Sequence, residues 1–172
     1  AQPRESVLVR VDGPLDLGAL ECGLRTLIEQ HDMLRVACED CEGRPVPVVR
    51  AEVDFALSVD LMAGIDPAAR PAHAVRELEA LARRPFDLGQ SPLMRVAIYR
   101  INPARHIVAI VLHHLVSDGW SASIMLRQLA ALYQARVARV PASPPESASH
   151  SALPYSTFVA RQRQWLASPE AA

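Results

Sequence analysis

The sequence contains no lysine, because all 18 of its basic residues are arginine. An enzyme that forms a Schiff base with its substrate, or that holds a nucleotide in a P-loop, needs a lysine. Both mechanisms are therefore excluded for this chain. The arginines are balanced by 19 acidic residues, and the resulting net charge of −1 gives no sign of a nucleic-acid or acidic partner.

Long apolar stretches and paired cysteines are also missing. No run approaches the roughly 20 apolar residues that a membrane-spanning helix needs. The three cysteines are Cys22, Cys38 and Cys41, and the single C-x-x-C has no second pair with which to hold a metal. We therefore expect reduced thiols in a cytoplasmic protein, with no metal and no contact with a membrane.

The remaining pattern is that of one globular domain, since half of the 172 residues are hydrophobic. Alternating or continuous apolar residues predict strands over residues 6–11, 34–38, 46–50, 93–101 and 106–114. Helical spacing predicts helices that start at Asp16, at Asp66-Pro67, near Asp118 and at Tyr155. Residues 140–154 are rich in proline, serine and alanine and are typical of a solvated loop.

The most informative stretch runs from Leu112 to Ser121, where the most apolar predicted strand meets a predicted helix. Both faces of that strand are apolar before the histidines, so both should be covered. Because strand side chains alternate, His113 and His114 should point to opposite faces. Only one of them can face a given pocket, and the other needs a buried hydrogen-bond partner.

The residues of this corner allow two interpretations. A histidine at a strand end is a candidate general base or hydrogen-bond donor, and Asp118 could orient it, cap the helix or pair with an arginine. Gly119 permits close approach of a ligand, and the amides of Gly119 and Trp120 could favour developing negative charge. Alternatively, the histidines belong to the core, Asp118 is a simple helix cap and Gly119 serves a turn.

The spelling of the corner, His113-His114-Leu115-Val116-Ser117-Asp118-Gly119, resembles the HHxxxDG signature of nonribosomal peptide synthetase condensation domains, and Trp120-Ser121 matches its common extension. Three other stretches agree in chain order. Residues 30–35 resemble RHExLR, with Gln30 in place of the arginine and Asp32 in place of the glutamate. Residues 86–95 resemble FDLxxxPLxR, and residues 155–166 resemble YxDFAxWQRxWL.

This resemblance implies an α/β fold (an α+β sandwich) of the chloramphenicol-acetyltransferase type, with helices packed on a mixed sheet. The family has two such lobes, and residues 1–172 resemble only the first of them. The family's earliest motif, SxAQxRLW, and the whole second lobe have no counterpart here. We therefore expect an N-terminal lobe, truncated at both ends, with residues 140–154 as an internal loop.

The family joins a donor acyl or peptidyl thioester to the amine of an acceptor aminoacyl thioester. Both substrates arrive on the 4'-phosphopantetheine arms of carrier proteins, so no cofactor is expected to bind the lobe directly. The partners implied are peptidyl or acyl carrier domains, the second lobe and an adjacent adenylation domain.

The resemblance also assigns roles to single residues. It makes His114 the catalytic histidine, which either takes a proton from the amine or orients it, and we favour positioning with partial proton transfer because a thioester is already activated. His113 and Asp118 support the corner, with Arg35 or an arginine of the second lobe as partner of Asp118, although Arg35 could equally make only a fold contact. The remaining assignments are a substrate contact for the Gly119 amide, an early-helix place for Ser121, and packing for Trp120, Tyr155, Phe158 and Trp165.

Other functions remain open. Epimerisation domains share the HHxxxDG corner, but their usual V-S-W-type extension fits this chain less well than Trp120-Ser121-Ala122 fits a condensation domain. Cyclisation domains would carry aspartates in place of the histidines, and acyltransferases that use coenzyme A share only a shorter motif. A different class of function is a non-catalytic subdomain that serves folding or carrier-protein docking, and the isolated lobe is expected to be inactive alone.

Overall fold

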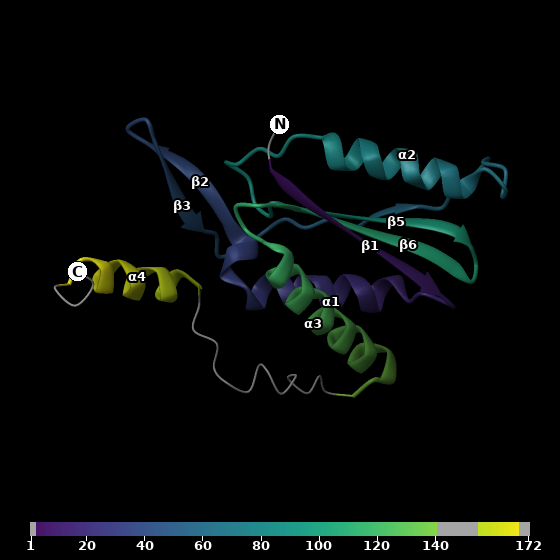
Figure 1. The fold of residues 1–172 in the computed structure, drawn as a ribbon. Coiled ribbons are helices and arrows are strands. Elements are labelled where there is room, and N and C mark those ends of the chain that lie inside the picture. Colours follow the sequence, from purple (N-terminus) through teal and green to yellow (C-terminus); the bar gives the residue numbers. More distant parts are fainter. Residues whose placement is uncertain (1–2, 141–154, 169–172) are drawn as a thin grey trace.

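The computed structural model describes residues 3–140 and 155–168 and shows an open sheet with helices on both faces (Figure 1). In chain order the elements are β1 (Arg4–Asp12), α1 (Leu17–Gln30), the 3-10 helix η1 (Asp32–Arg35), β2 (Val36–Cys41), β3 (Arg44–Val49), β4 (Ser58–Asp60), α2 (Arg70–Arg83), β5 (Met94–Asn102), β6 (Arg105–His113), α3 (Gly119–Ala138) and α4 (Tyr155–Leu166). The expected strand from Leu34 begins two residues later, because η1 takes up residues 32–35.

The main sheet has the strand order β1-β6-β5-β4, which makes β6 an interior strand. Antiparallel pairing joins β6 to both β1 and β5, whereas β4 runs parallel to β5, so the sheet is mixed as expected. A tight turn connects β5 and β6, and in it the Asn102 side chain accepts a hydrogen bond from the amide of Ala104 at 2.9 Å. The predicted hairpin over residues 93–114 is confirmed.

Helices cover both faces of the sheet, as the apolar character of β6 predicts. The side chains of Val108, Ile110 and Leu112 join a core with α1 and α3. The side chain of Ala109 faces the opposite side, where the helix α2 covers the sheet, and Val111 lies on that side with Phe86. Figure 1 shows this arrangement, with α2 on one side of the strands and the pair α1 and α3 on the other.

Two predicted helix starts have different outcomes. Asp16 caps α1, since its carboxylate accepts a hydrogen bond from the Ala19 amide at 2.9 Å. The expected start at Asp66-Pro67 is wrong, because α2 begins only at Arg70. The Asp66 carboxylate accepts from the Ala68 amide at 2.7 Å and so forms a separate turn before the helix.

The strands β2 and β3 form a two-stranded sheet of their own, which projects from the body in Figure 1. Pro45 and Pro47 lie in β3, and the position of β3 at an edge is as predicted, since proline cannot donate to a second neighbour. Cys38 and Cys41 lie on β2 as free thiols, and their three-residue separation places their side chains on opposite faces.

The last helix, α4, has the predicted bounds of 155–166 and contacts the body mainly at η1. The predicted loop over residues 140–154 lies, apart from Val140, outside the described residues. Within the described part of the chain, no helix combines the length and apolar character that crossing a membrane requires.

Candidate active site

The corner between β6 and α3 has well-defined hydrogen bonding. β6 ends at His113, and a turn follows in which the Val116 amide donates to the His113 carbonyl at 3.0 Å. Asp118 then caps α3, because its carboxylate accepts from both the amide of Ser121 at 2.8 Å and the Ser121 hydroxyl at 2.6 Å. These hydrogen bonds lower the pKa of Asp118, which keeps the cap ionised.

The two histidines lie on opposite sides of the corner, as the strand alternation predicts. His113 is buried on the α2 side, where its ring meets Phe86 edge to face with the centroids 5.9 Å apart. Its Nδ1 accepts a hydrogen bond from the Leu115 amide at 3.0 Å, which supplies the buried partner that the sequence requires. Burial, together with His114 and Arg4 nearby, lowers the pKa of His113.

His114 is exposed and lies on the other side, where its Nδ1 is 3.1 Å from the carbonyl oxygen of Ser117. A carbonyl only accepts, so Nδ1 carries the proton of this hydrogen bond. In the neutral ring, Nε2 is therefore left with a free lone pair. A histidine held in this tautomer can accept a hydrogen bond from an incoming N–H group.

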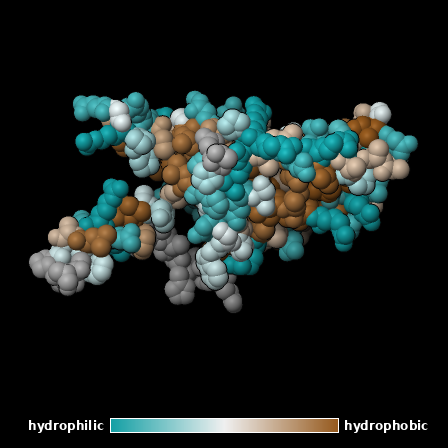
Figure 2. All heavy atoms as spheres, turned by 45° about the horizontal axis from the view of Figure 1, so that its top comes forward, coloured by the Kyte–Doolittle hydropathy of each residue, from teal (hydrophilic) through white to brown (hydrophobic). Residues whose placement is uncertain are grey.

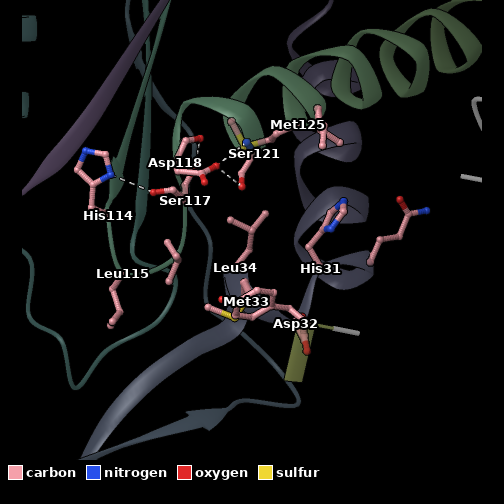
Figure 3. A pocket seen from close by; sticks show the side chains of 14 residues that line it. His31, Asp32, Met33, Leu34, His114, Leu115, Ser117, Asp118, Ser121 and Met125 are labelled. Carbon is pink, nitrogen blue, oxygen red and sulfur yellow. Dashed lines mark hydrogen bonds between the residues drawn. The ribbon is translucent and has the colours of Figure 1, made fainter. Parts of the chain in front are cut away.

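A pocket of about 390 Å³ opens beside His114 (Figure 3). One wall comes from residues 30–34 and the opposite wall from residues 114–118, and the start of α3 and Tyr155 complete it. Two motifs that lie about 80 residues apart in the sequence therefore meet at one cavity. Its lining is mostly apolar between Leu34 and Met125 and polar at His114, Ser117 and Asp118.

Side chains in the wall formed by residues 30–34 make hydrogen bonds to the helices α3 and α4. The Nε2 atom of His31 lies 2.6 Å from the side-chain oxygen of Gln128 on α3. Asp32 accepts hydrogen bonds from Ser156 on α4, from the hydroxyl at 2.7 Å and from the amide at 3.2 Å. Burial raises the pKa of Asp32, but these hydrogen bonds outweigh burial and the pKa is lowered.

Asp118 has no arginine partner among residues 3–140 and 155–168. Arg35 instead donates from Nη1 to the carbonyl of Arg50 at 2.8 Å, which makes it a fold contact between η1 and the end of β3. Its Nε is buried and has no hydrogen-bond partner in the described part of the chain. Of the two roles considered for Arg35, the structure shows the contact within the fold and not the pairing with Asp118.

The amides at the start of α3 are partly occupied. The main-chain amide of Ser121 donates to the Asp118 carboxylate at 2.8 Å, so this amide of the first turn is not free to meet developing negative charge. Gly119 lies close to the carboxylate of Glu5 on β1, since a side-chain carbon built on Gly119 would lie 3.5 Å from it.

Glu5 belongs to the corner although sequence reasoning missed it. Its carboxylate accepts from the Ser117 hydroxyl at 3.4 Å. The pairing of β1 with β6, which sets Glu5 opposite Leu112, brings it there. The only signal in the sequence was its place near the start of a predicted strand, and that signal does not reveal the partner strand.

Several aromatic residues that were expected to pack are exposed. Trp120 has 77% of its surface accessible, and Tyr155, Phe158 and Trp165 on α4 are each about half exposed. Within the described residues Trp120 is therefore not packed, whereas the rings of Tyr155 and Phe158 contact each other with their centroids 5.9 Å apart. Figure 2 shows α4 as a separate projection with hydrophobic side chains on its surface. Their spacing is that of an amphipathic helix, but the described part of the molecule offers no second surface for the apolar face.

Comparison with known proteins agrees with this geometry. The family model described as Condensation domain matches residues 4–172. A linear gramicidin synthase protein of Brevibacillus parabrevis is 38% identical over 92% of this chain. Phosphinothricin tripeptide synthetase of Streptomyces viridochromogenes is 33% identical over 95% of it. The chain spans 2% and 13% of the length of these two relatives.

Solved structures show the same fold. The starter condensation domain of rhizomide synthetase superposes with a TM-score of 0.82 at 21% identity, covering 96% of this chain and 38% of that one. The SgcC5 protein from Streptomyces globisporus gives a TM-score of 0.80, also at 21% identity, over 96% of this chain and 36% of that one. The expected α/β lobe of the chloramphenicol-acetyltransferase type is thereby confirmed.

Proposed function

The chain belongs to the condensation-domain family, and from this premise we propose that it supplies the histidine-bearing lobe of a catalyst that forms amide bonds in nonribosomal peptide synthesis. The donor is an acyl or peptidyl thioester and the acceptor is the amine of an aminoacyl thioester. Both are carried on 4'-phosphopantetheine arms, which are substrates delivered by carrier proteins and not resident cofactors. Carrier domains, a second lobe and an adenylation domain are the proposed partners.

The single observation that supports this proposal best is the state of His114. His114 lines the pocket, and its ring is held through Nδ1 by the Ser117 carbonyl at 3.1 Å, which leaves Nε2 as a hydrogen-bond acceptor. An amine that approaches a thioester carbonyl has N–H groups to donate to such an acceptor. A group fixed in this way contributes by positioning, which is worth a large factor when the carbonyl is already activated.

The proposed step balances as follows. The acceptor nitrogen forms a bond to the donor carbonyl carbon, and the carbon–sulfur bond of the thioester breaks. The proton that the nitrogen loses passes by way of the Nε2 atom of His114 to the departing thiolate, so the donor's arm leaves as a free thiol. Among solved neighbours, a variant of the starter condensation domain of rhizomide synthetase has been determined in complex with C8-CoA and Leu-SNAC.

We further propose that the isolated lobe needs the second lobe for turnover. Trp120 at the start of α3 and the aromatic residues of α4 present apolar surface that a covering partner would remove from water. Tyr155 of α4 and the start of α3 line the pocket, so a second lobe that covered them would also exclude solvent from the reaction.

The test is the detection, by intact mass, of peptide on an acceptor carrier protein. Donor-loaded and acceptor-loaded carriers are mixed with this chain, alone and together with a separately produced second lobe. We expect product only with both lobes, and a fall of about 10²–10⁴-fold for His114→Ala. The matched control is His73→Ala, because His73 lies on α2 beside Asp60 and outside the pocket.

Other outcomes separate the alternatives. Equal product with His114→Ala would overturn the proposed role of His114. Carrier binding without product in any mixture would favour the non-catalytic docking subdomain. An epimerisation domain would instead exchange the α-hydrogen of its substrate with deuterated solvent and form no new amide.

A further inference from the structure

The FDLxxxPLxR-like stretch over residues 86–95 lines no part of the pocket, unlike the other corner motifs. Its first and last members, Phe86 and Arg95, nevertheless contact each other, and Phe86 contacts His113 of the corner. They lie on the α2 side of the sheet, where His113 is also buried. The contacts of these three side chains form a continuous path to the turn that carries His114.

Arg95 is fixed at both ends of its guanidinium group. Its Nη1 donates to the Arg84 carbonyl at 2.6 Å and its Nη2 to the Pro85 carbonyl at 2.7 Å. The central carbon of the guanidinium lies 3.9 Å from the centroid of the Phe86 ring. A planar, bidentate donor stacked on a ring is specific to arginine, and lysine cannot reproduce it.

Phe86 passes this constraint to His113. Its side chain is buried, and its ring plane makes an angle of 86° with the ring of His113 at a centroid separation of 5.9 Å. Such an edge-to-face contact is favoured by the charge distribution of the rings and depends on their mutual orientation. A Phe86 ring held by Arg95 therefore restricts the rotation of the imidazole.

His113 in turn fixes the main chain on both sides of His114. The Leu115 amide donates to Nδ1 of His113, which requires that this nitrogen be unprotonated and that Nε2 carry the ring hydrogen. His114 lies between these two residues, and its own amide donates to the Pro3 carbonyl at 3.2 Å. The His113 ring thus holds the main chain directly after His114 through this hydrogen bond.

We propose that Arg95 and Phe86 are positioning residues, which hold the His113 ring in the orientation and tautomer that fix the place of His114 at the pocket. This inference rests on the proposed role of His114 but is testable without turnover. It assigns to the two ends of the FDLxxxPLxR-like stretch a task beyond filling the core. Neither residue touches the pocket, so both act through His113.

The experiment uses the full chain with its histidines labelled by ¹⁵N, at about pH 8, where an imidazole of ordinary pKa near 6.5 is neutral. Long-range proton–nitrogen correlation spectra report which nitrogen of each ring carries the hydrogen. We expect wild-type His113 to be protonated at Nε2. In Phe86→Leu we expect a second tautomer of His113 and shifted or broadened signals of His114.

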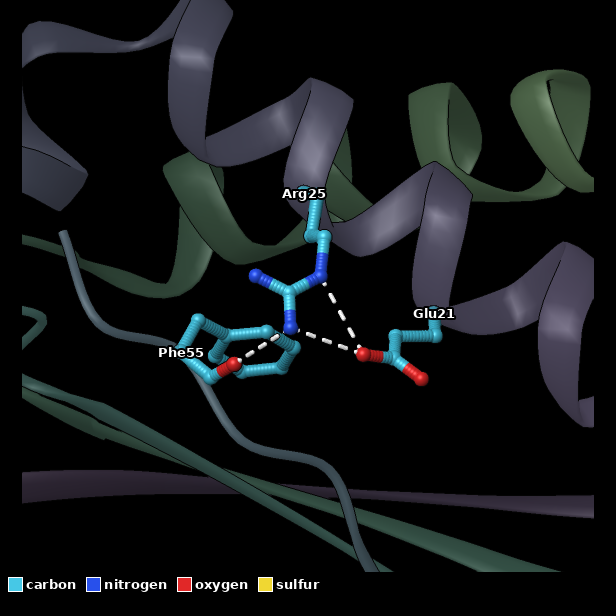
Figure 4. Close-up of polar contacts among 3 residues, drawn as sticks. All are labelled: Glu21, Arg25 and Phe55. Carbon is cyan, nitrogen blue, oxygen red and sulfur yellow. Dashed lines mark hydrogen bonds and ion pairs between the residues drawn. The ribbon is translucent and has the colours of Figure 1, made fainter. Parts of the chain in front are cut away.

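The matched control is Phe55→Leu. Phe55 is also buried and also lies under an arginine, Arg25, but in the core on the opposite face of the sheet (Figure 4). Each variant replaces a buried phenylalanine ring by leucine, so both disturb packing to a similar extent. A change in the His113 and His114 signals in Phe86→Leu that is absent in Phe55→Leu supports the proposal. Unchanged signals in both variants, or equal changes in both, would overturn it.

Arg95→Lys provides a second test if Phe86→Leu does not fold. It keeps the positive charge but loses the two-fold donation to the carbonyls of Arg84 and Pro85. We expect the same histidine signals to move, and unchanged signals would remove Arg95 from the proposal. In the two-lobe carrier assay, we expect each variant to lower turnover about 10–100-fold, because small misplacements of a positioning group have effects of this size.

The two readouts separate failure of this inference from failure of the proposed function. If wild-type protein forms no amide product, the proposed function fails while the spectra still test the path from Arg95 to His114. If amide product forms but Phe86→Leu turns over like wild type with unchanged spectra, only the positioning inference fails.

Discussion

Two phenylalanines, Phe55 and Phe86, lie under arginines on opposite faces of the same sheet, and the difference between them lies in what the rings touch. The Arg25 guanidinium lies 5.8 Å from the ring of Phe55, whereas that of Arg95 lies 3.9 Å from Phe86. Arg25 also donates to the Phe55 carbonyl at 2.8 Å and pairs with Glu21, as Figure 4 shows.

The surroundings of the two arginines differ as well. No ion pair to a carboxylate is present for Arg95 in the described residues, and its donors go to the carbonyls of Arg84 and Pro85, directly after the negative end of α2. Burial, followed by the charges of Arg84 and Arg4, lowers the pKa of Arg95. Phe55 contacts the aliphatic core of α1 and α3, but Phe86 contacts a histidine. The arginine–phenylalanine pair on one face therefore holds the segment around Phe55. The pair on the other face contacts His113 at the corner.

The largest expected effect is a loss of stability, and it should be similar when either phenylalanine is truncated. Phe55 is 3% exposed and Phe86 is 6% exposed, so Phe55→Ala and Phe86→Ala should each lower the free energy of unfolding by about 3–5 kcal/mol. Urea unfolding followed by circular dichroism measures both. A loss below about 1 kcal/mol for either variant would show that the two rings are not equivalent parts of the core.

The next effect separates the two buried histidines of β6, His106 and His113. Leucine at 113 leaves the Leu115 amide without its acceptor, so His113→Leu should lower the free energy of unfolding by about 1–3 kcal/mol. His106 has a buried Nδ1 with no partner among the described residues. His106→Leu should stay within about 1 kcal/mol of wild type, because that unsatisfied group is removed. Equal losses in the two variants would contradict this distinction.

The same histidines give the protein a pH dependence. Burial is the largest cause that lowers the pKa of both, with Arg100 as a further cause at His106 and His114 and Arg4 at His113. Below the ordinary value of about 6.5, the unfolded chain then binds more protons than the folded one, so stability falls as the pH falls. Unfolding measured at pH 8 and pH 5.5 should show a smaller loss for His113→Leu than for wild type, and an equal loss would argue against this assignment.

The smallest expected effect concerns Glu21, the carboxylate partner of Arg25, which has no equivalent beside Arg95 in the described residues. Glu21 and Arg25 form an exposed ion pair one helical turn apart at 2.8 Å. Glu21→Gln should therefore lower the free energy of unfolding by no more than about 0.5 kcal/mol, and less at high salt. The histidine spectra should be unchanged. A loss well above 1 kcal/mol would mean that Glu21, and not the ring of Phe55, holds Arg25 in place.

Much of the fold could be predicted from local pattern. The apolar character of β6 predicted cover on both faces, and the helix after Tyr155 was predicted with its bounds, because these features depend on neighbouring residues. The start of α2 was not, since Asp66 satisfies local amides in a turn of its own instead of capping the helix. A cap and a turn use the same residue types, and only the main-chain path distinguishes them.

The two histidines of the site could be predicted from the sequence, but the residues that contact them could not. Alternation placed His113 and His114 on opposite sides, but it did not reveal that Phe86 or the Leu115 amide would meet His113. Contacts such as that of Glu5 with Ser117 join residues more than 100 positions apart and depend on strand order. The exposure of Trp120 was missed because helical spacing gives the apolar side of a helix but not whether another surface covers it.

The pairing of β1 with β6 has a consequence for the order in which the molecule assembles. β5 and β6 are neighbours in the chain and can pair as soon as both exist, whereas Arg4 must wait for His113, about 100 residues later. Closing so long a loop costs more entropy than closing a hairpin, and such contacts form late. The amide of His114 finds the Pro3 carbonyl only when β1 arrives. β1 precedes β5 and β6 in the chain, but it pairs after them and completes the corner as it docks.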